Sequence, residues 1–276
     1  MAPPVLLTGA TGLIGFRVLQ ELLRNNYRVR ITARSANKVQ SVTTHPLIRP
    51  FESQLTTALI PDINAANAFD EALKDVTYVI HTGSPVPIPG TDPLRDVWSP
   101  TVDGTASLLT SALRFSTIKR IVLTSSIVAT IPLSPLPPST APEVPVSITA
   151  SSRVPLPANT TATPDVFETY VLAKTIALSN ADTFMKTQNP DFTLAHVIPG
   201  YVLGRDERVH DAEMAAHMPS SCGILLQGLT GIDVLVPLHG GFVHVDDLAE
   251  MFLRVMELET EVQMESFGAC VPVDFG

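Results

Sequence analysis

The chain has 276 residues, of which 45% are hydrophobic and 16% charged, so it can bury a sizeable core in one large domain and is not a disordered segment. Its formal net charge is −9, and an acidic surface argues against nucleic acid and anionic membranes as main partners. The two cysteines, Cys222 and Cys270, form neither a disulfide framework nor a metal-ligand pattern, which favours a reducing compartment. The sequence shows no secretory leader and no long uncharged apolar run, and we therefore predict a cytoplasmic protein without a membrane span.

Short runs of β-forming residues alternate with helical patterns along the chain, which is typical of a parallel sheet with crossover helices. Residues 4–8 form an apolar run that predicts a first, fully buried strand. Residues 13–26 repeat apolar side chains at helical spacing, and the two asparagines at the end of this stretch suit a helix terminus. The same patterns predict strands at 27–34, 59–63, 76–85, 119–126 and 192–200, and helices at 67–75, 103–116, 168–188 and 245–258.

Two stretches interrupt this alternation. Residues 131–164 are rich in proline, serine and threonine, so we expect a long irregular insertion of the kind that forms functional lids or mobile surface segments. Residues 201–241 combine glycines, histidines and methionines, and their apolar residues follow neither the helical nor the strand spacing. The apolar run 224–238 inside them is too short and too interrupted for a membrane span, and we expect it to line a core, a pocket or an interface.

The sequence TGATGLIG lies between the first predicted strand and the first predicted helix. There Gly9 allows a tight turn, Gly12 lets the backbone approach a pyrophosphate, and Gly15 lets the helix pack closely on the strand. The helix N-terminus offers free N–H groups and the positive end of its dipole to an anion. We therefore predict a dinucleotide-binding loop formed by Thr8, Gly9, Thr11, Gly12, Leu13, Ile14 and Gly15.

The end of the second predicted strand indicates which dinucleotide binds. An NAD-binding fold usually places an acid there for the ribose diol, whereas an NADP-binding one uses a cation. The stretch ITARSANK (31–38) contains Arg34 and Lys38 and no acid. Arg34 could clamp the 2′-phosphate, with Ser35 as an added donor and Lys38 as a second charge. The alternative is a solvated basic turn, and we favour NADPH.

The sequence YVLAK places Tyr170 and Lys174 on one face of the predicted helix 168–188. Together with the glycine loop and the strand that ends in VLTSS, this order resembles the extended branch of the short-chain dehydrogenase/reductase family. The chain is most similar to the dihydroflavonol-reductase and cinnamoyl-CoA-reductase group and to fungal aldehyde and ketone reductases, over most of residues 4–258. The resemblance implies that Asp62 and Ile63 hold the adenine, that Thr82, Gly83 and Ser84 line the cofactor, and that Pro199 lies against the nicotinamide.

The resemblance also implies a catalytic set. A carbonyl oxygen gains negative charge as hydride arrives, so it needs a hydrogen-bond donor and a proton source. Tyr170 would donate the proton, Lys174 would favour the phenolate and bind the nicotinamide ribose, and Ser126 would hold the substrate oxygen. Ser125 remains the alternative to Ser126, because both residues end the same strand.

Three features depart from the family, and the first is a gap from Ser126 to Tyr170 that the Pro-rich insertion makes longer than expected. Asp103 stands where relatives often carry an asparagine that supports a proton relay through the lysine. The chain ends at PVDFG, before the C-terminal helices that cover the substrate in relatives, so we expect a more open pocket, or one completed by the insertion or another subunit. Apart from the family comparison, His210 and His217 could share a helix face, but a solvated helix or a pocket-lining histidine is the favoured interpretation, and we predict no metal site.

These features predict a Rossmann-type doubly wound α/β protein with a small discontinuous substrate lobe. We assign residues 1–200 and 238–258 to the dinucleotide-binding domain, and 201–237 and 259–276 to a shortened substrate lobe. The predicted protein is an NADPH-dependent reductase of a bulky hydrophobic aldehyde or ketone, in secondary metabolism, and a monomer or homodimer. The alternatives are an NAD-dependent nucleotide-sugar epimerase or dehydratase, and a non-redox relative such as a cyclase, an isomerase or a nucleotide-sensing regulator.

Overall fold

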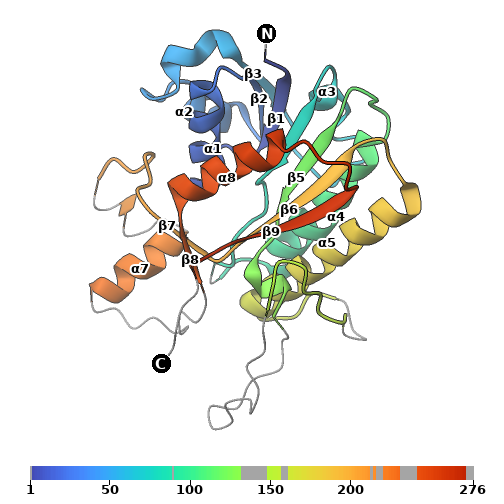
Figure 1. The fold of residues 1–276 in the computed structure, drawn as a ribbon. Coiled ribbons are helices and arrows are strands. Elements are labelled where there is room, and N and C mark those ends of the chain that lie inside the picture. The colour runs from blue at the N-terminus through green and yellow to red at the C-terminus, as the bar shows by residue number, and fades with distance from the viewer. Residues whose placement is uncertain are drawn as a thin grey trace.

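A parallel sheet forms the centre of the molecule (Figure 1). The computed structural model describes residues 2–88, 90–131, 148–156, 161–211, 214–215, 220–230 and 241–271. The strands of this sheet are β1 (Pro4–Thr8), β2 (Arg28–Ala33), β3 (Leu55–Leu59), β4 (Tyr78–His81), β5 (Arg120–Thr124), β6 (Thr193–Pro199) and β9 (Met264–Ala269). They lie in the order β3-β2-β1-β4-β5-β6-β9, and every neighbouring pair is parallel.

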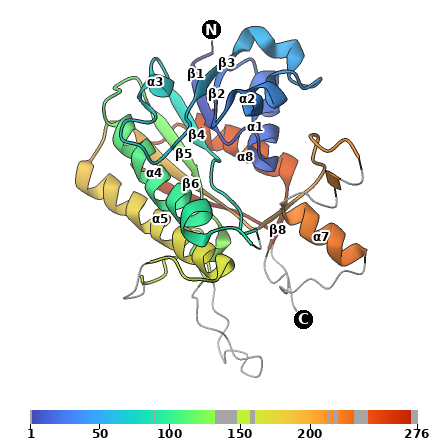
Figure 2. The ribbon, with the colours of Figure 1, turned by 180° about the vertical axis from the view of Figure 1, so that it is seen from behind.

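Helices cover both faces of the sheet, which is why its central strands carry mainly apolar side chains on both faces. One face carries α1 (Leu13–Arg24), α2 (Ala36–Thr43) and α8 (Val245–Glu257), and the other carries α3 (Asp70–Leu73), α4 (Ser99–Ala112) and α5 (Val166–Gln188). Figure 1 shows α1 and α8 in front of the sheet, and Figure 2, from behind, shows α4 and α5. Two hydrophobic cores result, one on each face, and each fully buried leucine in them contributes about 1.5–3 kcal/mol of apolar burial.

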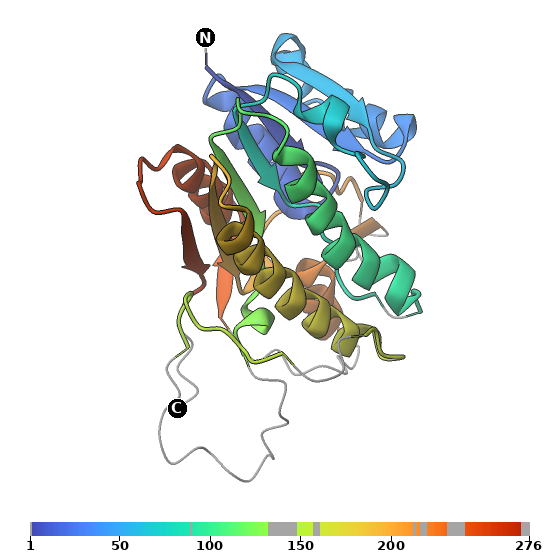
Figure 3. The ribbon, with the colours of Figure 1, turned by 90° about the vertical axis from the view of Figure 1, so that its right-hand side faces the viewer.

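A smaller unit lies beyond the carboxyl ends of the strands. The strands β7 (Tyr201–Leu203) and β8 (Phe242–His244) form a separate parallel pair, and α7 (Ser221–Leu229) packs on β7. Figure 3 shows α4 and α5 side by side, with this unit towards their lower ends. Three short helical segments complete the described chain: η1 (Arg49–Gln54), the π-helix η2 (Pro93–Trp98) and η3 (Ile127–Ala129).

The strand order creates a switch point in the sheet. The chain steps outward from β1 to β2 and β3, and then crosses back to place β4 on the other side of β1. In open parallel sheets, ligands bind at the carboxyl ends of the strands where the order reverses. The loops that follow β1, β4, β5 and β6 therefore meet at the edge where a dinucleotide would lie.

The predicted α/β fold is confirmed, with the parallel sheet and the flanking helices in the expected order. The strand predicted at 59–63 is wrong, because β3 lies at 55–59. It is an edge strand whose threonines face solvent, so it lacks the apolar run of a buried strand. The helix expected at 67–75 is one turn, 70–73.

The lobe boundaries differ in one place. Residues 259–276 were expected in the substrate lobe, whereas β9 joins the main sheet beside β6. The remaining division into domains stays a prediction. Most of the insertion predicted at 131–164 lies outside the described residues, as does the part of the apolar run from 231 to 238. No helix within the described ranges is long and apolar enough to cross a membrane.

Candidate active site

The phosphate loop between β1 and α1 depends on two glycines for its own packing. Gly9 has a φ of +73°, and a Cβ there would lie 2.7 Å from the backbone of Thr82. A Cβ on Gly15 would overlap the carbonyl group of Gly9. Gly12 differs, because a Cβ on it would only touch the Gly9 oxygen at 3.4 Å. The protein itself therefore does not need a glycine at position 12, and the open backbone there suits the close approach of a ligand.

The N-terminus of α1 points at this loop without a cap. Gly12 is its N-cap residue, no side chain accepts from its first N–H groups, and its first turn holds no acid. Such a helix end binds anions through its N–H groups and its dipole. The N–H groups that begin with Leu13 and Ile14 therefore fit the pyrophosphate of a dinucleotide.

The segment that follows β4 is hydrogen bonded to the end of β1. The Thr82 hydroxyl donates to the Thr8 carbonyl oxygen over 2.7 Å, and the Gly83 N–H donates to Thr8 Oγ1 over 3.2 Å. Ser84 Oγ lies 3.1 Å from Thr101 Oγ1 on α4. These bonds hold residues 82–84 beside the phosphate loop at the switch point.

The predicted adenosine side lies at the carboxyl end of β2. Arg34 follows that strand with an exposed side chain, and Lys38 lies in the first turn of α2. Ser35 caps α2, because its hydroxyl accepts from the Lys38 N–H at 3.5 Å. The Asp62 carboxylate accepts from the Asn64 N–H at 2.9 Å. Ile63, which was also predicted on this side, packs against Gly104 of α4. A Cβ on Gly104 would lie only 2.7 Å from the Ile63 side chain.

The two candidate serines at the end of β5 face different surroundings. Ser126 begins η3, where its hydroxyl accepts from the Val128 N–H at 3.4 Å, and it lies close enough to Tyr170 to lower the pKa of the phenol. Ser125 is buried, and its hydroxyl oxygen has no hydrogen-bond partner among the described residues. Ser126 is therefore the serine that lies by Tyr170.

Tyr170 and Lys174 lie one turn apart on α5, and the ammonium nitrogen of Lys174 is 5.9 Å from the centre of the Tyr170 ring. Lys174 is buried, and its Nζ donates to the Thr124 carbonyl oxygen over 3.0 Å. Burial lowers the pKa of Lys174 to about 8. Pro199 ends β6 at the same edge of the sheet and is buried.

The pKa of the Tyr170 phenol is raised, not lowered. Burial raises it most, the hydrogen bond with Ser126 lowers it, and Tyr201 raises it further. From the sequence, the Lys174 charge was expected to favour the phenolate, whereas the net shift in the structure favours the neutral phenol, with burial as its largest cause. A phenol that stays protonated near neutral pH is suited to donate a proton.

The structure also places two features that were noted in the sequence, Asp103 and the histidines near residue 210. Asp103 is exposed on α4 and accepts from the Ser99 hydroxyl at 2.6 Å, so its carboxylate does not face Lys174. His210 stacks on His45 with ring centres 5.9 Å apart, whereas His217 lies outside the described residues. Within the part of the chain that the structure describes, no group of three or more metal-binding side chains could hold an ion.

His81 was not among the site residues predicted from the sequence. This residue ends β4, is buried, and lies 2.8 Å (Nδ1) from the Thr8 hydroxyl. Burial and, to a smaller extent, the charge of Lys174 lower the pKa of His81 to about 4. A polar residue at the end of the otherwise apolar strand YVIH was the sequence feature that could have identified it.

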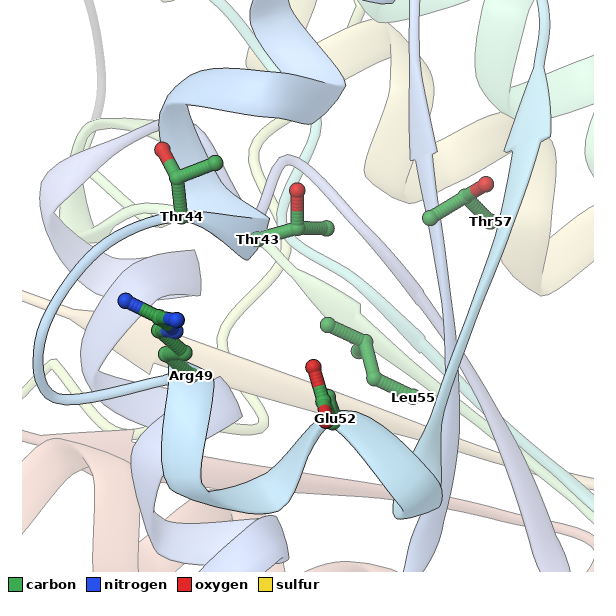
Figure 4. Close-up of a pocket in the computed structure, with 6 residues that line it drawn as sticks. All are labelled: Thr43, Thr44, Arg49, Glu52, Leu55 and Thr57. Atoms are coloured by element: carbon green, nitrogen blue, oxygen red, sulfur yellow. The ribbon is translucent and has the colours of Figure 1, made fainter.

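A hollow of about 390 Å³ lies away from Tyr170 and Lys174, between α2, η1 and β3 (Figure 4). Leu55 is the first residue of β3, so this hollow is at the amino edge of the sheet, opposite the edge that holds Tyr170. Figure 4 shows threonine hydroxyls with one arginine and one glutamate around it. The lining holds no histidine, cysteine, tyrosine or lysine, and this hollow lacks a catalytic set. Its six lining residues are Thr43, Thr44, Arg49, Glu52, Leu55 and Thr57.

Comparison with known proteins points to one family. The model of the NAD-dependent epimerase/dehydratase family matches residues 5–267. An NAD-dependent epimerase/dehydratase from Alternaria alternata is 33% identical over 94% of this chain and 74% of its own length. A ketoreductase from Cercospora beticola is 36% identical over 74% of this chain and 57% of its own length. An NADPH-dependent methylglyoxal reductase from Saccharomyces cerevisiae is 30% identical over 90% of this chain and 72% of its own length.

Solved structures agree on the fold. The crystal structure of yeast methylglyoxal/isovaleraldehyde reductase complexed with NADPH has a TM-score of 0.80 and 25% identity, covering 97% of this chain and 78% of that chain. A UDP-glucuronic acid 4-epimerase from Bacillus cereus has a TM-score of 0.64 at 16% identity over 98% of this chain and 78% of that chain, a likeness in fold alone.

Proposed function

Because the chain belongs to the NAD-dependent epimerase/dehydratase family, in the extended branch of the short-chain dehydrogenases/reductases, we propose that it is an NADPH-dependent reductase of aldehydes or ketones. The observation that carries this proposal is the meeting of Ser126, Tyr170 and Lys174 at the carboxyl edge of the sheet, next to the phosphate loop. A protonated phenol beside a buried ammonium is what the reduction of a carbonyl group requires.

The residues that would hold the dinucleotide span the switch point. The backbone at Gly12 and the N-terminus of α1 receive the pyrophosphate, residues 82–84 line its other side, and Lys174 and Pro199 lie toward the nicotinamide end. Arg34 and Lys38 favour the 2′-phosphate of NADPH, since residues 34–44 contain no acid that would bind a ribose diol. Asp62 and Ile63 complete the adenine side in this proposal.

The bound cofactor supplies the hydride, and the protein supplies the proton. Ser126 and Tyr170 donate hydrogen bonds to the carbonyl oxygen as its negative charge develops. The proton of the Tyr170 hydroxyl then moves to that oxygen, which becomes the product alcohol. The positive charge of Lys174 stabilises the phenolate that remains on Tyr170.

The substrate we propose is bulky and hydrophobic. The segments that follow β4 and β5 leave apolar side chains exposed at the edge that holds Tyr170, among them Val86, Ile88 and Ile131. Exposed apolar side chains next to convergent polar groups are typical of small-molecule sites. The likeness to a fungal ketoreductase supports a ketone or aldehyde as the reacting group. A role in secondary metabolism, a cytoplasmic location and a monomeric or dimeric state stay predictions.

The experiment that tests this function starts with the cofactor. Fluorescence titration of the purified protein with NADPH and NADH should give tighter binding of NADPH. Arg34→Asp should raise the Kd for NADPH at least about tenfold, equivalent to about 1.4 kcal/mol, because the 2′-phosphate loses its bidentate partner. Arg28→Asp is the matched control, since it makes the same change at the amino end of the same strand, where the side chain is also exposed.

A screen of carbonyl compounds follows, with methylglyoxal, isovaleraldehyde and bulkier aromatic aldehydes and ketones as probes and the loss of NADPH absorbance as the readout. Turnover of at least one probe is expected. If no probe is turned over although NADPH binds, or if NADH binds more tightly, reductase activity is the wrong assignment.

The second candidate is an NAD-dependent epimerase or dehydratase, as the name of the Alternaria relative allows. Such an enzyme would retain NAD through its catalytic cycle, so tightly bound NAD in the purified protein would favour it. A non-redox reaction would instead be revealed by a product that forms without cofactor turnover.

A further inference from the structure

The segment 204–210, which leaves strand β7 of the smaller unit, reaches back to the phosphate loop. Nη1 of Arg208 donates to the carbonyl oxygen of Thr11, which lies between Gly9 and Gly12 of that loop. The two residues are 197 positions apart in the chain, so this contact exists only in the folded protein. A single side chain thus connects the smaller unit to the loop that fits a pyrophosphate.

The Arg208 guanidinium is held in one orientation by Asp206. Nε of Arg208 donates to one carboxylate oxygen over 2.8 Å, and Nη2 donates to the other over 2.5 Å, which is a bidentate pair. The Asp206 side chain is 6% exposed and that of Arg208 is 21% exposed. A carboxylate removed from water needs a partner of opposite charge, so this pair is held together and directs Nη1 at the Thr11 carbonyl.

A second contact holds the same segment against the dinucleotide side. The Leu47 N–H donates to Nδ1 of His45 over 3.3 Å, so the neutral ring carries its proton on Nε2. Nε2 then donates to the Glu207 carbonyl oxygen, 3.1 Å away. His45 is buried and packs edge-on against Phe16 of α1, with ring centres 4.8 Å apart. Segment 204–210 is therefore fixed beside α1 as well as at the phosphate loop.

The other end of the segment is tied to the smaller unit. Strand β7 leads directly into it and pairs with β8. The Cys222 thiol of α7 donates to the Gly204 carbonyl oxygen over 3.2 Å, and a Cβ on Gly204 would lie 2.7 Å from the Val245 side chain. A change in the position of segment 204–210 therefore changes the contacts of β7 and α7.

We propose that Arg208, aligned by Asp206, is a positioning residue that couples the phosphate loop to the smaller unit and so prepares both for NADPH. This inference rests on the proposed function. A carbonyl oxygen that accepts from Arg208 cannot turn its negative end to the pyrophosphate, and the N–H groups at the start of α1 are left to face the anion. Because NADPH binds the loop in this conformation, it also stabilises segment 204–210.

The charges favour this role over direct binding of a phosphate by Arg208. Its Nε, Nη1 and Nη2 each have a partner, and the Asp206 carboxylate offsets its positive charge. If Arg208 bound the phosphate directly, removal of that carboxylate would free the guanidinium and strengthen NADPH binding. If Asp206 aligns Arg208 on the Thr11 carbonyl, the same change weakens NADPH binding. The two roles therefore predict effects of opposite sign for Asp206→Asn.

Fluorescence titration with NADPH measures that sign. Arg208→Gln and Asp206→Asn should each raise the Kd about five- to tenfold, and the double variant should be no weaker than Arg208→Gln, since both changes remove one connection. Arg205→Gln is the matched control, because Arg205 lies in the same segment, is exposed and pairs with Glu207. The Kd of the control should stay within about twofold of the wild type. A lowered Kd in Asp206→Asn overturns the proposal.

Arg208→Lys covers the case in which Arg208→Gln fails to fold. A lysine keeps a partner for the buried Asp206 charge, but it cannot bond both carboxylate oxygens and the Thr11 carbonyl oxygen at once. The Kd for NADPH should rise at least about threefold in this variant. Wild-type affinity in Arg208→Lys overturns the proposal.

Amide hydrogen exchange, followed by mass spectrometry, supplies a readout that does not depend on activity. In the wild type, NADPH should slow exchange about fivefold or more in residues 204–210 as well as in 9–15, and in Arg208→Gln only in 9–15. A purely structural pair would leave 204–210 unaffected by NADPH in the wild type, and that result overturns the proposal. If the coupling is seen but no carbonyl probe is reduced, the reductase assignment fails and the coupling stands. If no dinucleotide binds, both fail.

Discussion

At the scale of single residues, the structure separates side chains that look equivalent in the sequence. Ser125 and Ser126 are neighbours at the end of β5, yet Ser126 lies by Tyr170 while the buried Ser125 hydroxyl has no hydrogen-bond partner among the described residues. Tyr170 has a raised pKa and Lys174 a lowered one, and burial is the main cause of both shifts. Near neutral pH, this combination leaves a neutral phenol to donate and a positive charge to stabilise the phenolate.

We predict that Tyr170→Phe lowers kcat by about 10³-fold or more, because the proton donor is lost while the ring and its packing remain. Affinity for NADPH, measured by fluorescence titration, should change little. Tyr78→Phe serves as the control, since Tyr78 is partly buried at the amino end of β4, away from the carboxyl edge. A Tyr170→Phe enzyme with more than a tenth of wild-type kcat would rule out Tyr170 as the donor.

At the scale of elements, the phosphate loop and α1 show that glycines in one pattern serve different needs. Gly9 and Gly15 are required by the protein itself, because any Cβ there would overlap neighbouring backbone. Gly12 is free of such contacts at the N-terminus of α1. The packing of α1 against α8 is supported at its edge by Arg17, whose Nε donates to Asp246 over 2.6 Å, and by Tyr27, whose hydroxyl donates to Glu257 over 2.7 Å.

This difference predicts opposite outcomes for two alanine substitutions. Gly15→Ala should lower the free energy of unfolding by about 1–3 kcal/mol, because α1 must move away from the loop. Gly12→Ala should leave that free energy within about 0.5 kcal/mol but raise the Kd for NADPH at least about tenfold. Urea unfolding and fluorescence titration measure the two effects. Equal losses of stability in both variants would contradict separate roles for these glycines.

At the scale of the whole molecule, buried polar groups tie distant segments together. Arg120 on β5 is buried and donates to Thr193 Oγ1 over 2.9 Å and to the carbonyl oxygens of Val255 and Leu258. These bonds hold the C-terminal end of α8 against β5, and the next element along the chain is β9. A row of paired positions crosses the sheet from Thr8 through His81 and Leu123 to His196, so the candidate site is built into the core.

A pH dependence of stability follows from His81. Its pKa is about 4 in the folded protein and 6.5 when unfolded, so the unfolded state binds the extra proton first. The stabilisation is complete above pH 6.5 and is lost as the pH falls toward 4, a change of about 3 kcal/mol at 1.4 kcal/mol per pKa unit. Urea unfolding between pH 4 and 7 should show this slope in the wild type.

The slope should be weaker in His81→Asn, which cannot titrate there. His210→Gln is the control, because it removes a histidine whose side chain is exposed. The same slope in the wild type and in His81→Asn would assign the acid sensitivity to other groups.

Those features that depend on local order along the chain could be predicted from the residues alone. The alternation of strands and helices, the glycine loop between β1 and α1, and the Tyr170–Lys174 pair are set by residue spacing within one or two elements. Edge strand β3 and the polar helix α2 escaped that analysis, because their side chains face solvent and carry no apolar period.

The residues that meet across the sheet could be identified only from the folded chain. Strand β9 pairs with β6, and His81, Ser125, Lys174 and His196 surround one cavity, although they come from four elements. Asp103 turns to solvent while Thr101 and Thr105, on the same helix, line that cavity. Burial and pairing of this kind depend on contacts between segments far apart in the chain, so the shifted pKa values and the unpartnered polar atoms could not be predicted from residue spacing.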